Sequence, residues 1–215
     1  MSERYDYREG PPRQVPGYSS LHRMVTMLLA ERVPREGRIL VLGAGGGLEL
    51  LAMAEAQPGW QFVGVDPDAS MLALAGDTTR AYADRISLHT GVIDDAPAGL
   101  FDGAVSLLTF HFIAREKRRQ TLQGLHARLV HGAPLVLAHI SFPQAEPERS
   151  RWLSRHVVFG GTAPENEERA KHAMRTRLTI LDPAEEEAHL RAAGFDGVSL
   201  FYAGLSFRGW VAYAS

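Results

Sequence analysis

The fold is decided by one stretch of the chain, Ile39-Leu40-Val41-Leu42-Gly43-Ala44-Gly45-Gly46-Gly47-Leu48-Glu49. Residues 39–42 form a short apolar run, which predicts a buried strand. The glycines that follow allow a sharp turn and a close approach of a ligand to the backbone. A helix is predicted from Leu48 onward, and its first N–H groups carry partial positive charge. The order of strand, glycine loop and helix therefore predicts a ligand site within an α/β fold.

The spacing of the glycines narrows the class of ligand. A phosphate-binding loop ends in Gly-Lys-Ser/Thr, which is absent here. A dinucleotide loop has its third glycine at the sixth position, which is Leu48, so a nicotinamide oxidoreductase is disfavoured. Gly43, Gly45 and Gly47 have instead the spacing associated with S-adenosylmethionine. A loop that merely turns tightly is the alternative, but four glycines among five residues argue against it.

Asp66 is the second signal for a nucleoside site. It follows a predicted strand at 61–65 and lies 23 residues after Gly43. A carboxylate at that place can accept hydrogen bonds from both hydroxyls of a ribose. The alternative is that Asp66 only caps the helix after Pro67. We favour the ribose because the glycine loop and the carboxylate occur together.

Short apolar runs alternate with helical patterns through the first two thirds of the chain, which predicts a parallel sheet covered on both faces. The end of the chain predicts an antiparallel hairpin. The fold class is therefore α/β, doubly wound, in a single domain over 1–215 with an irregular N-terminal arm at 1–18 and a lid or insertion at 146–180. The predicted strands are 38–42, 61–65, 86–89, 101–108, 134–139, 198–202 and 207–213, and the predicted helices are 19–33, 48–56, 69–83, 116–130 and 184–193, with two more inside the lid.

Composition excludes several kinds of site. The 215 residues include 23 Lys plus Arg and 25 Asp plus Glu, so the net charge is −2 and indicates neither nucleic-acid nor membrane binding. There is no cysteine, which excludes disulfides, thiolate metal sites and a cysteine nucleophile. No metal-ligand cluster is recognisable. The N-terminus is charged and rich in proline, and no apolar run approaches ~20 residues, so we expect a soluble cytoplasmic protein.

Taken together, these motifs resemble the class I S-adenosylmethionine-dependent methyltransferases. The resemblance implies a seven-stranded sheet whose last strand is antiparallel. A more detailed resemblance, to the carboxy-S-adenosylmethionine synthases of wobble-uridine tRNA modification, runs along nearly the whole chain. The class motifs are VGVDP at 63–67, GVIDDAP at 91–97, FD at 101–102 and GAPLVL at 132–137; those of the synthases are RQVPGYS at 13–19, MLLAER at 27–32, TFHF at 109–112 and AAGF at 192–195.

The resemblance implies S-adenosylmethionine as cofactor and a set of binding residues. Four departures matter. Leu42 stands where many relatives have an acidic residue, Val92 replaces the aspartate that faces the adenine, and Leu107 replaces an asparagine. The synthases' carboxylate-binding arginine has no clear counterpart, with Lys171, His172 and Arg175 as nearby candidates. We therefore rank methyl transfer above synthesis of the carboxylated cofactor. The implied residues are Gly43, Ala44, Gly45 and Gly47 at the methionine part, Asp66 at the ribose with Pro67 beside it, Val92 and Ile93 at the adenine, Leu107 in place of the family's asparagine, and Tyr18 closing over the cofactor.

The acceptor is expected to be a small molecule. His111 follows the fourth strand and His139 ends the fifth, so either could serve as a general base, and His111 is the better candidate. A hydrogen-bonded structural role is the favoured alternative for each. The cationic stretch 149–156 could face RNA, but we favour a solvated helix face with Trp152 packed inward. Aromatic residues of the hairpin could form a homodimer contact. Alternatives to the methyltransferase are a carboxy-S-adenosylmethionine synthase and a non-catalytic binder of S-adenosylmethionine.

Overall fold

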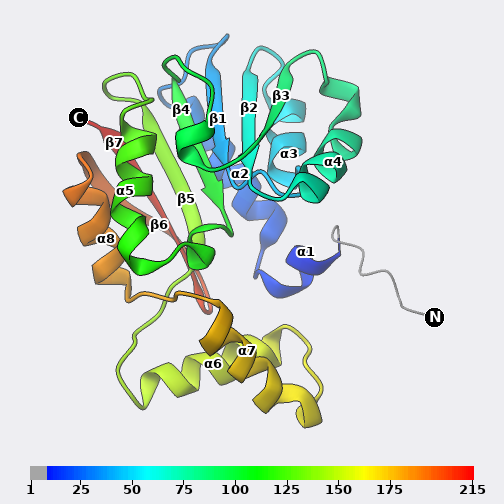
Figure 1. Ribbon diagram of the computed structural model, residues 1–215, viewed down its shortest axis with the longest axis vertical. Helices are drawn as coiled ribbons and strands as arrows, with labels where there is room; N and C mark the ends of the chain where they lie inside the picture. Colours follow the sequence, from blue (N-terminus) through cyan, green and yellow to red (C-terminus); the bar gives the residue numbers. More distant parts are fainter. Residues whose placement is uncertain (1–8) are drawn as a thin grey trace.

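A single twisted sheet organises the computed structural model, which describes residues 9–215 (Figure 1). The sheet has seven strands in the order β3-β2-β1-β4-β5-β7-β6. The five strands from β1 to β5 are parallel to one another, and β7 runs antiparallel to both β5 and β6. The strands are β1 (Arg38–Leu42), β2 (Gln61–Asp66), β3 (Ile86–Thr90), β4 (Gly103–Leu107), β5 (Pro134–Ile140), β6 (Phe195–Gly204) and β7 (Phe207–Ala214).

Eight α-helices connect or cover these strands in the part of the chain that the structure describes. Two helix starts follow from their sequence: Asp68 accepts hydrogen bonds from the N–H groups of Ser70 and Met71, and Asp182 accepts one from Ala184. The helices are α1 (Gly10–Gln14), α2 (Tyr18–Ala30), α3 (Leu48–Ala56), α4 (Ala69–Thr78), α5 (Arg115–His126), α6 (Glu148–Phe159), α7 (Glu167–Arg177) and α8 (Pro183–Ala192), and the 3₁₀ turns are Arg80–Tyr82, Ile93–Asp95, Phe110–Phe112 and Pro164–Asn166.

Each face of the sheet has its own hydrophobic core. Successive residues of a strand point to opposite faces, and β1 divides accordingly. Ile39 and Val41 pack into the core beneath α2 and α3, whereas Leu40 and Leu42 pack into the core beneath α5 and α8. Helices cover both faces of β1, so its buried residues are all apolar and do not alternate with polar ones.

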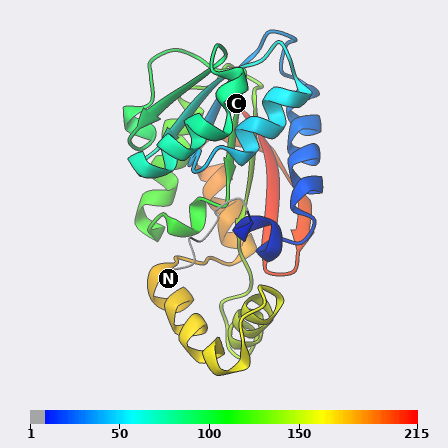
Figure 2. The same ribbon diagram turned by 90° about the vertical axis from the view of Figure 1, so that its right-hand side faces the viewer.

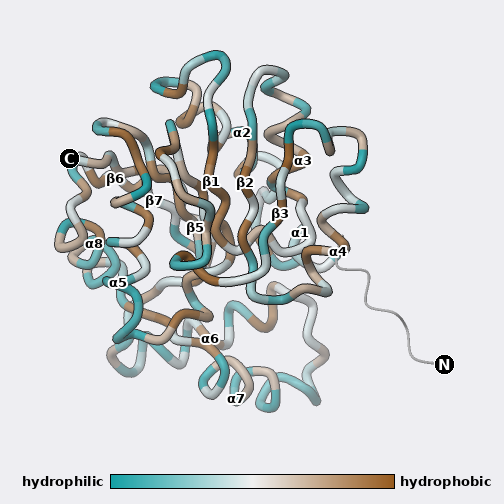
Figure 3. The backbone as a smooth tube through the Cα atoms, turned by 45° about the horizontal axis from the view of Figure 1, so that its top comes forward, coloured by the Kyte–Doolittle hydropathy of each residue, from teal (hydrophilic) through white to brown (hydrophobic). Residues whose placement is uncertain are grey.

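Helices α6 and α7 form a pair that projects beyond the carboxyl ends of the parallel strands (Figure 2). Trp152 of α6 holds the pair to the body: its ring stacks on Phe142 at 6.4 Å, and Arg208 of β7 lies 5.5 Å from its centroid. Colouring by hydropathy shows brown along β1 and β2 and mostly teal along α7 (Figure 3), so the pair is a surface appendage with a small apolar seam.

The predicted fold class is confirmed, including the antiparallel C-terminal pair. Several local expectations were wrong. The helices predicted at 69–83 and 116–130 end at Thr78 and His126, the strand predicted at 101–108 covers only Gly103–Leu107, and the strand predicted at 198–202 extends over Phe195–Gly204. A short helix, α1, stands where only irregular chain was expected. Pro11 and Pro12 follow Gly10 in the first turn of that helix, where proline fits because no N–H is needed. Among residues 9–215 no helix is long and apolar enough to span a bilayer.

Candidate active site

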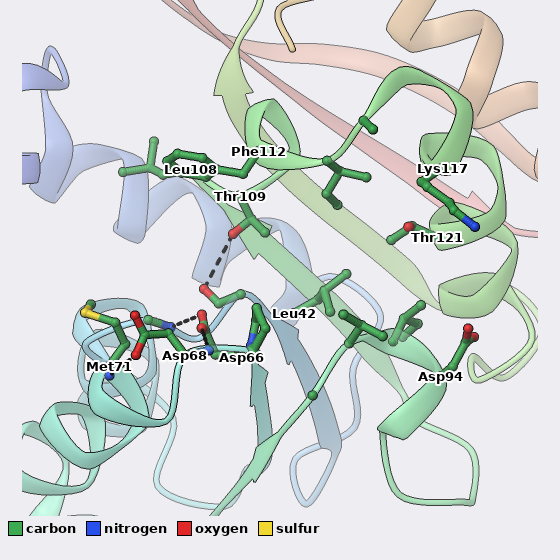
Figure 4. Close-up of a pocket in the computed structure, with 18 of the residues that line it drawn as sticks. Leu42, Asp66, Asp68, Met71, Asp94, Leu108, Thr109, Phe112, Lys117 and Thr121 are labelled. Carbon is green, nitrogen blue, oxygen red and sulfur yellow. Dashed lines mark hydrogen bonds between the residues drawn. The ribbon is translucent and has the colours of Figure 1, made fainter. Parts of the chain in front are cut away.

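A cavity of about 770 Å³ opens at the carboxyl ends of β1, β2 and β4 (Figure 4). From β1 the chain builds the sheet outward through β2 to β3, and it then returns to place β4 on the other side of β1; open α/β sheets bind ligands at such a switch point. The volume lies within the usual range for small-molecule sites. The following sequence-predicted residues line it: Gly43, Gly45, Asp66, Pro67, Val92, Ile93 and Leu107.

The glycine loop is held in place by strand β2. The N–H groups of Gly43 and Ala44 donate to the carbonyl of Val65, at 2.7 and 3.1 Å. Gly43 has φ +77°, and a Cβ on it would lie 2.0 Å from Thr109 Oγ1, so no other residue fits there. Gly47 begins α3 with φ +80° and packs against Ala75, which makes its role structural. Gly47 and Ala44 do not line the cavity.

Asp66 joins the glycine loop to the residues that follow β2. Its Oδ2 accepts a hydrogen bond from the Gly45 N–H at 2.9 Å, and its Oδ1 accepts one from the Asp68 N–H at 2.9 Å (Figure 4). A carboxylate has about four lone-pair sites, so both oxygens can still accept hydrogen bonds from a ligand. Gly45 and Asp66 therefore lie side by side at one wall of the cavity, as the sequence predicted for a loop and a carboxylate acting together.

Two consecutive aspartates, Asp94 and Asp95, have different roles at the opposite wall of the cavity. Asp95 makes the local turn, since its Oδ2 accepts the Val92 N–H at 2.9 Å. Asp94 lines the cavity, where its carboxylate lies on the same side as Lys117 and Thr121 (Figure 4). Val92 is 50% exposed at the rim. Asp94 thus lines the cavity two residues after Val92, which the sequence interpretation missed because it assigned both aspartates to a turn.

The residues that follow β4 form the third wall of the cavity. Leu108 adopts φ +56°, an uncommon conformation for a branched residue, and this bend turns Thr109 toward the glycine loop. Thr109 Oγ1 donates to the carbonyl of Leu107 at 2.9 Å. Phe112 lines the cavity although 67% of it is exposed, so it forms an apolar lip at the opening. Further lining residues that the sequence interpretation missed are Met71, Lys117, Gln120 and Thr121.

Neither histidine proposed as a general base lines the cavity. His111 sits in the 3₁₀ turn Phe110–Phe112 and is buried, with 5% exposure, and its ring centroid lies 4.5 Å from that of Phe112. Its Nδ1 accepts the Ile140 N–H at 3.3 Å. Burial, followed by the charges of His139, Arg118 and His156, lowers the pKa of His111 well below its ordinary value. His111 is therefore neutral and bound to the backbone of β5.

His139 belongs to a buried polar network. It has no exposed surface, its ring stacks on Phe110 at 5.6 Å, and its Nε2 lies 2.9 Å from Oε1 of Glu186. Arg118, also fully buried, donates to Glu186 and to the carbonyls of Ile113 and Thr179. Burial raises the pKa of Glu186, but His139 and Arg118 outweigh it and lower that pKa overall. This network ties β5, α5 and α8 together behind the cavity wall.

Tyr18 and the expected lid take no part in this cavity. Tyr18 is the first residue of α2, and its ring lies 4.3 Å from that of His22. The first eight residues of the predicted arm lie outside the described residues. No residue of α6 or α7 lines the cavity either. Within residues 9–215 no group of three or more His, Asp or Glu side chains could hold a metal ion.

One acidic side chain behind the glycine loop is held in its neutral form. Glu49 lies in the first turn of α3 with 6% exposure. Burial, with a smaller contribution from the charge of Asp66, raises the pKa of Glu49 to about 8. At neutral pH Glu49 is therefore mostly protonated and adds little negative charge at this end of the cavity.

Comparison with known proteins agrees with this geometry. Residues 40–135 match the family model described as a methyltransferase domain. The carboxy-S-adenosyl-L-methionine synthase of Chromohalobacter salexigens is 31% identical over 212 residues, which cover 94% of this chain and 77% of the relative. The ribosomal RNA small subunit methyltransferase H of Mycolicibacterium gilvum is 35% identical over 128 residues, which cover 53% of this chain and 34% of that protein.

Solved structures share the fold at low identity. An O-methyltransferase family protein from Burkholderia thailandensis superposes with a TM-score of 0.69 at 14% identity, over 91% of this chain and 55% of that one. Human N-acetylserotonin methyltransferase, solved in complex with S-adenosylmethionine, gives 0.64 at 14% identity, over 97% of this chain and 57% of that one. The chain thus spans little more than half the length of these two structures.

The cavity fits S-adenosylmethionine by its chemistry. Gly45 and Asp66 meet at one wall, with free lone pairs on the carboxylate, and Ile93 offers an apolar surface for a purine. The volume suits a nucleoside joined to an amino acid. With this site and the similarity over nearly the whole chain, the protein belongs to the class I S-adenosylmethionine-dependent methyltransferases.

Proposed function

We propose that this protein transfers the methyl group of S-adenosylmethionine to a small-molecule acceptor. The observation that carries the proposal is the cavity itself. Its space continues past Gly45 and Asp66 to Leu108, Thr109 and Phe112, which leaves room for a second molecule beside the cofactor. A protein that merely stored the cofactor would not need that room.

In this proposal each wall binds one part of the cofactor. The backbone at Gly43 and Gly45 faces the methionine part, Asp66 accepts hydrogen bonds from the ribose hydroxyls, and Ile93 packs on the adenine. Asp94 accepts a hydrogen bond from the exocyclic amine, in place of the residue that is Val92 here. Two observations support the assignment: Asp66 is fixed by two backbone N–H groups, and Asp94 lines the cavity.

The bound cofactor would supply a methyl group that is already activated by its sulfonium. The protein then has mainly to orient the acceptor in line with that methyl and to exclude water. Leu108 and Phe112 form an apolar wall suited to that task, and Thr109 is held facing the glycine loop by its bond to Leu107. We leave His111 and His139 out of the reaction because both are buried away from the cavity.

A carboxy-S-adenosylmethionine synthase is the second candidate, favoured by the 31% identity to such a protein. Against it, no arginine lines the cavity within the described residues, and Lys117 is the one cation there. A carboxylate on the transferred group would need a strong cationic partner. We therefore place methyl transfer first.

Three measurements separate the candidates. Calorimetry with S-adenosylmethionine, S-adenosylhomocysteine and NAD should give heat with the first two alone; NAD binding alone would reject the proposal. Labelled S-adenosylmethionine offered with a panel of phenols, acids and amines should yield a methylated product. Incubation with prephenate, followed by mass spectrometry of the cofactor, would instead yield a carboxylated cofactor if the protein is a synthase. Tight binding of the cofactor with no product from any acceptor class would favour the non-catalytic binder.

A further inference from the structure

A second cavity, of about 370 Å³, lies between the body of the protein and the helix pair α6–α7. Three arginines from three different helices line it: Arg115 at the start of α5, Arg149 in α6 and Arg175 in α7. Its apolar lining includes Phe142 and Leu153, both of which are buried. No Asp or Glu is among the described residues that line this cavity.

The positive charge of this cavity is only partly neutralised. Arg115 is paired with Glu185 at its rim. Arg149 and Arg175 have no salt bridge to any residue of the described range 9–215, and Glu168, the nearby acid on α7, is paired with Lys171. Guanidinium groups that face one space repel one another, and an oxyanion placed between them would bind with charge-assisted hydrogen bonds. An apolar floor beneath such cations suits a ring or chain that carries a carboxylate or phosphate.

The two cavities share one wall. Ile113 and Ala114 line the first cavity, and Arg115, the next residue, lines the second. Consecutive Cα atoms lie about 3.8 Å apart. Thr179, from the second cavity, donates its N–H to the carbonyl of His111 at 2.8 Å, and the next residue, Phe112, lines the first cavity. The two cavities are therefore neighbours, and the segment 113–115 lies between them.

We propose that the second cavity binds the oxyanion, a carboxylate or a phosphate monoester, of a small-molecule methyl acceptor whose reacting end enters the first cavity. This inference rests on the proposed function and adds the substrate class. An RNA phosphate is the less favoured occupant, because the net charge is −2 and the arginines converge on a small hollow instead of a broad basic surface.

The test uses calorimetry of the full chain with benzoate and phenyl phosphate as probes. The variant is Arg149→Gln/Arg175→Gln. Its control is Arg151→Gln/Arg177→Gln, which removes the same charge from the same two helices at positions that line neither cavity. We expect one of the probes to bind the unaltered protein and the control alike, and to bind the variant about tenfold or more weakly. The probe that binds better identifies the oxyanion as carboxylate or phosphate.

Three results with the probes and variants would overturn the inference, and competition with the cofactor would be a fourth. The three are that neither probe binds the unaltered protein, that both double variants lose affinity equally, or that the Arg149/Arg175 variant loses binding of a ribo-oligonucleotide while probe binding is unchanged. The probe must also bind when S-adenosylhomocysteine is saturating, because acceptor and cofactor are held together; competition between them would refute an acceptor site. Both variants should keep their affinity for S-adenosylhomocysteine. If the unaltered protein does not bind S-adenosylhomocysteine at all, the proposed function fails. The probe titrations do not depend on that result, so the two failures can be told apart.

Discussion

Removal of the guanidinium of Arg118 should expose how much the buried network behind the active site contributes to stability. Arg118 has no exposed surface and donates to Glu186, which is 2% exposed. In Arg118→Met the Glu186 carboxylate keeps its contact with His139 Nε2 at 2.9 Å but loses its permanent positive partner. The carbonyls of Ile113 and Thr179 lose a donor as well.

Breaking a buried ion pair by removing one partner costs about 3–5 kcal/mol, because the remaining charge stays buried. We therefore expect Arg118→Met to lower the free energy of unfolding by that amount, a large part of the usual total of roughly 5–15 kcal/mol. The measurement is unfolding in urea, monitored by circular dichroism. The two proteins are compared with the same slope of unfolding free energy against urea concentration. Arg119→Met is the matched control: Arg119 is the exposed neighbour in the same helix, and its change should stay within about 0.5 kcal/mol.

A second substitution tests the cause. If the unpaired carboxylate is what costs stability, Arg118→Met/Glu186→Gln should be more stable than Arg118→Met, by about 1–3 kcal/mol, because Gln carries no charge and still accepts a hydrogen bond from His139. A double variant that unfolds at the same or lower urea concentration than Arg118→Met would refute the reasoning. The loss would then come from packing of the arginine stem.

Three further predictions concern the active site. Asp66→Ala should weaken S-adenosylhomocysteine binding by roughly 1.5–3 kcal/mol in calorimetry, whereas the surface change Asp77→Ala should not; equal affinities would remove Asp66 from the site. Asp94→Ala should abolish the preference for S-adenosylhomocysteine over its inosine analogue, which lacks the exocyclic amine; a preference that survives would place the adenine elsewhere. Glu49 has a folded pKa of about 8 against an ordinary value of 4.5, so the folded state holds a proton that the unfolded state releases, and its contribution to stability falls between pH 4.5 and 8. Glu49→Gln should flatten that fall, whose slope is at most about 1.4 kcal/mol per pH unit; parallel profiles for the two proteins would show that Glu49 is not the group responsible.

The sequence by itself determined the architecture and one wall of the site. The run 39–42 is apolar at every residue, which is required of a strand buried on both faces, and Gly43 stands where any side chain would collide with Thr109. Both requirements are local, so a short segment of the sequence is enough to reveal them. The pairing of Gly45 with Asp66 was equally accessible, because the carboxyl ends of neighbouring parallel strands meet at one edge.

Tertiary structure alone decided which way the side chains after the strands point. His111 and Phe112 are adjacent in sequence, yet the 3₁₀ turn sends His111 into the core and Phe112 to the cavity. His139 ends a strand at the expected edge but is held by Glu186, which lies 47 residues further on. Arg149 and Arg175 converge from separate helices. No periodicity encodes such orientations, because they depend on contacts between segments that are far apart in the chain.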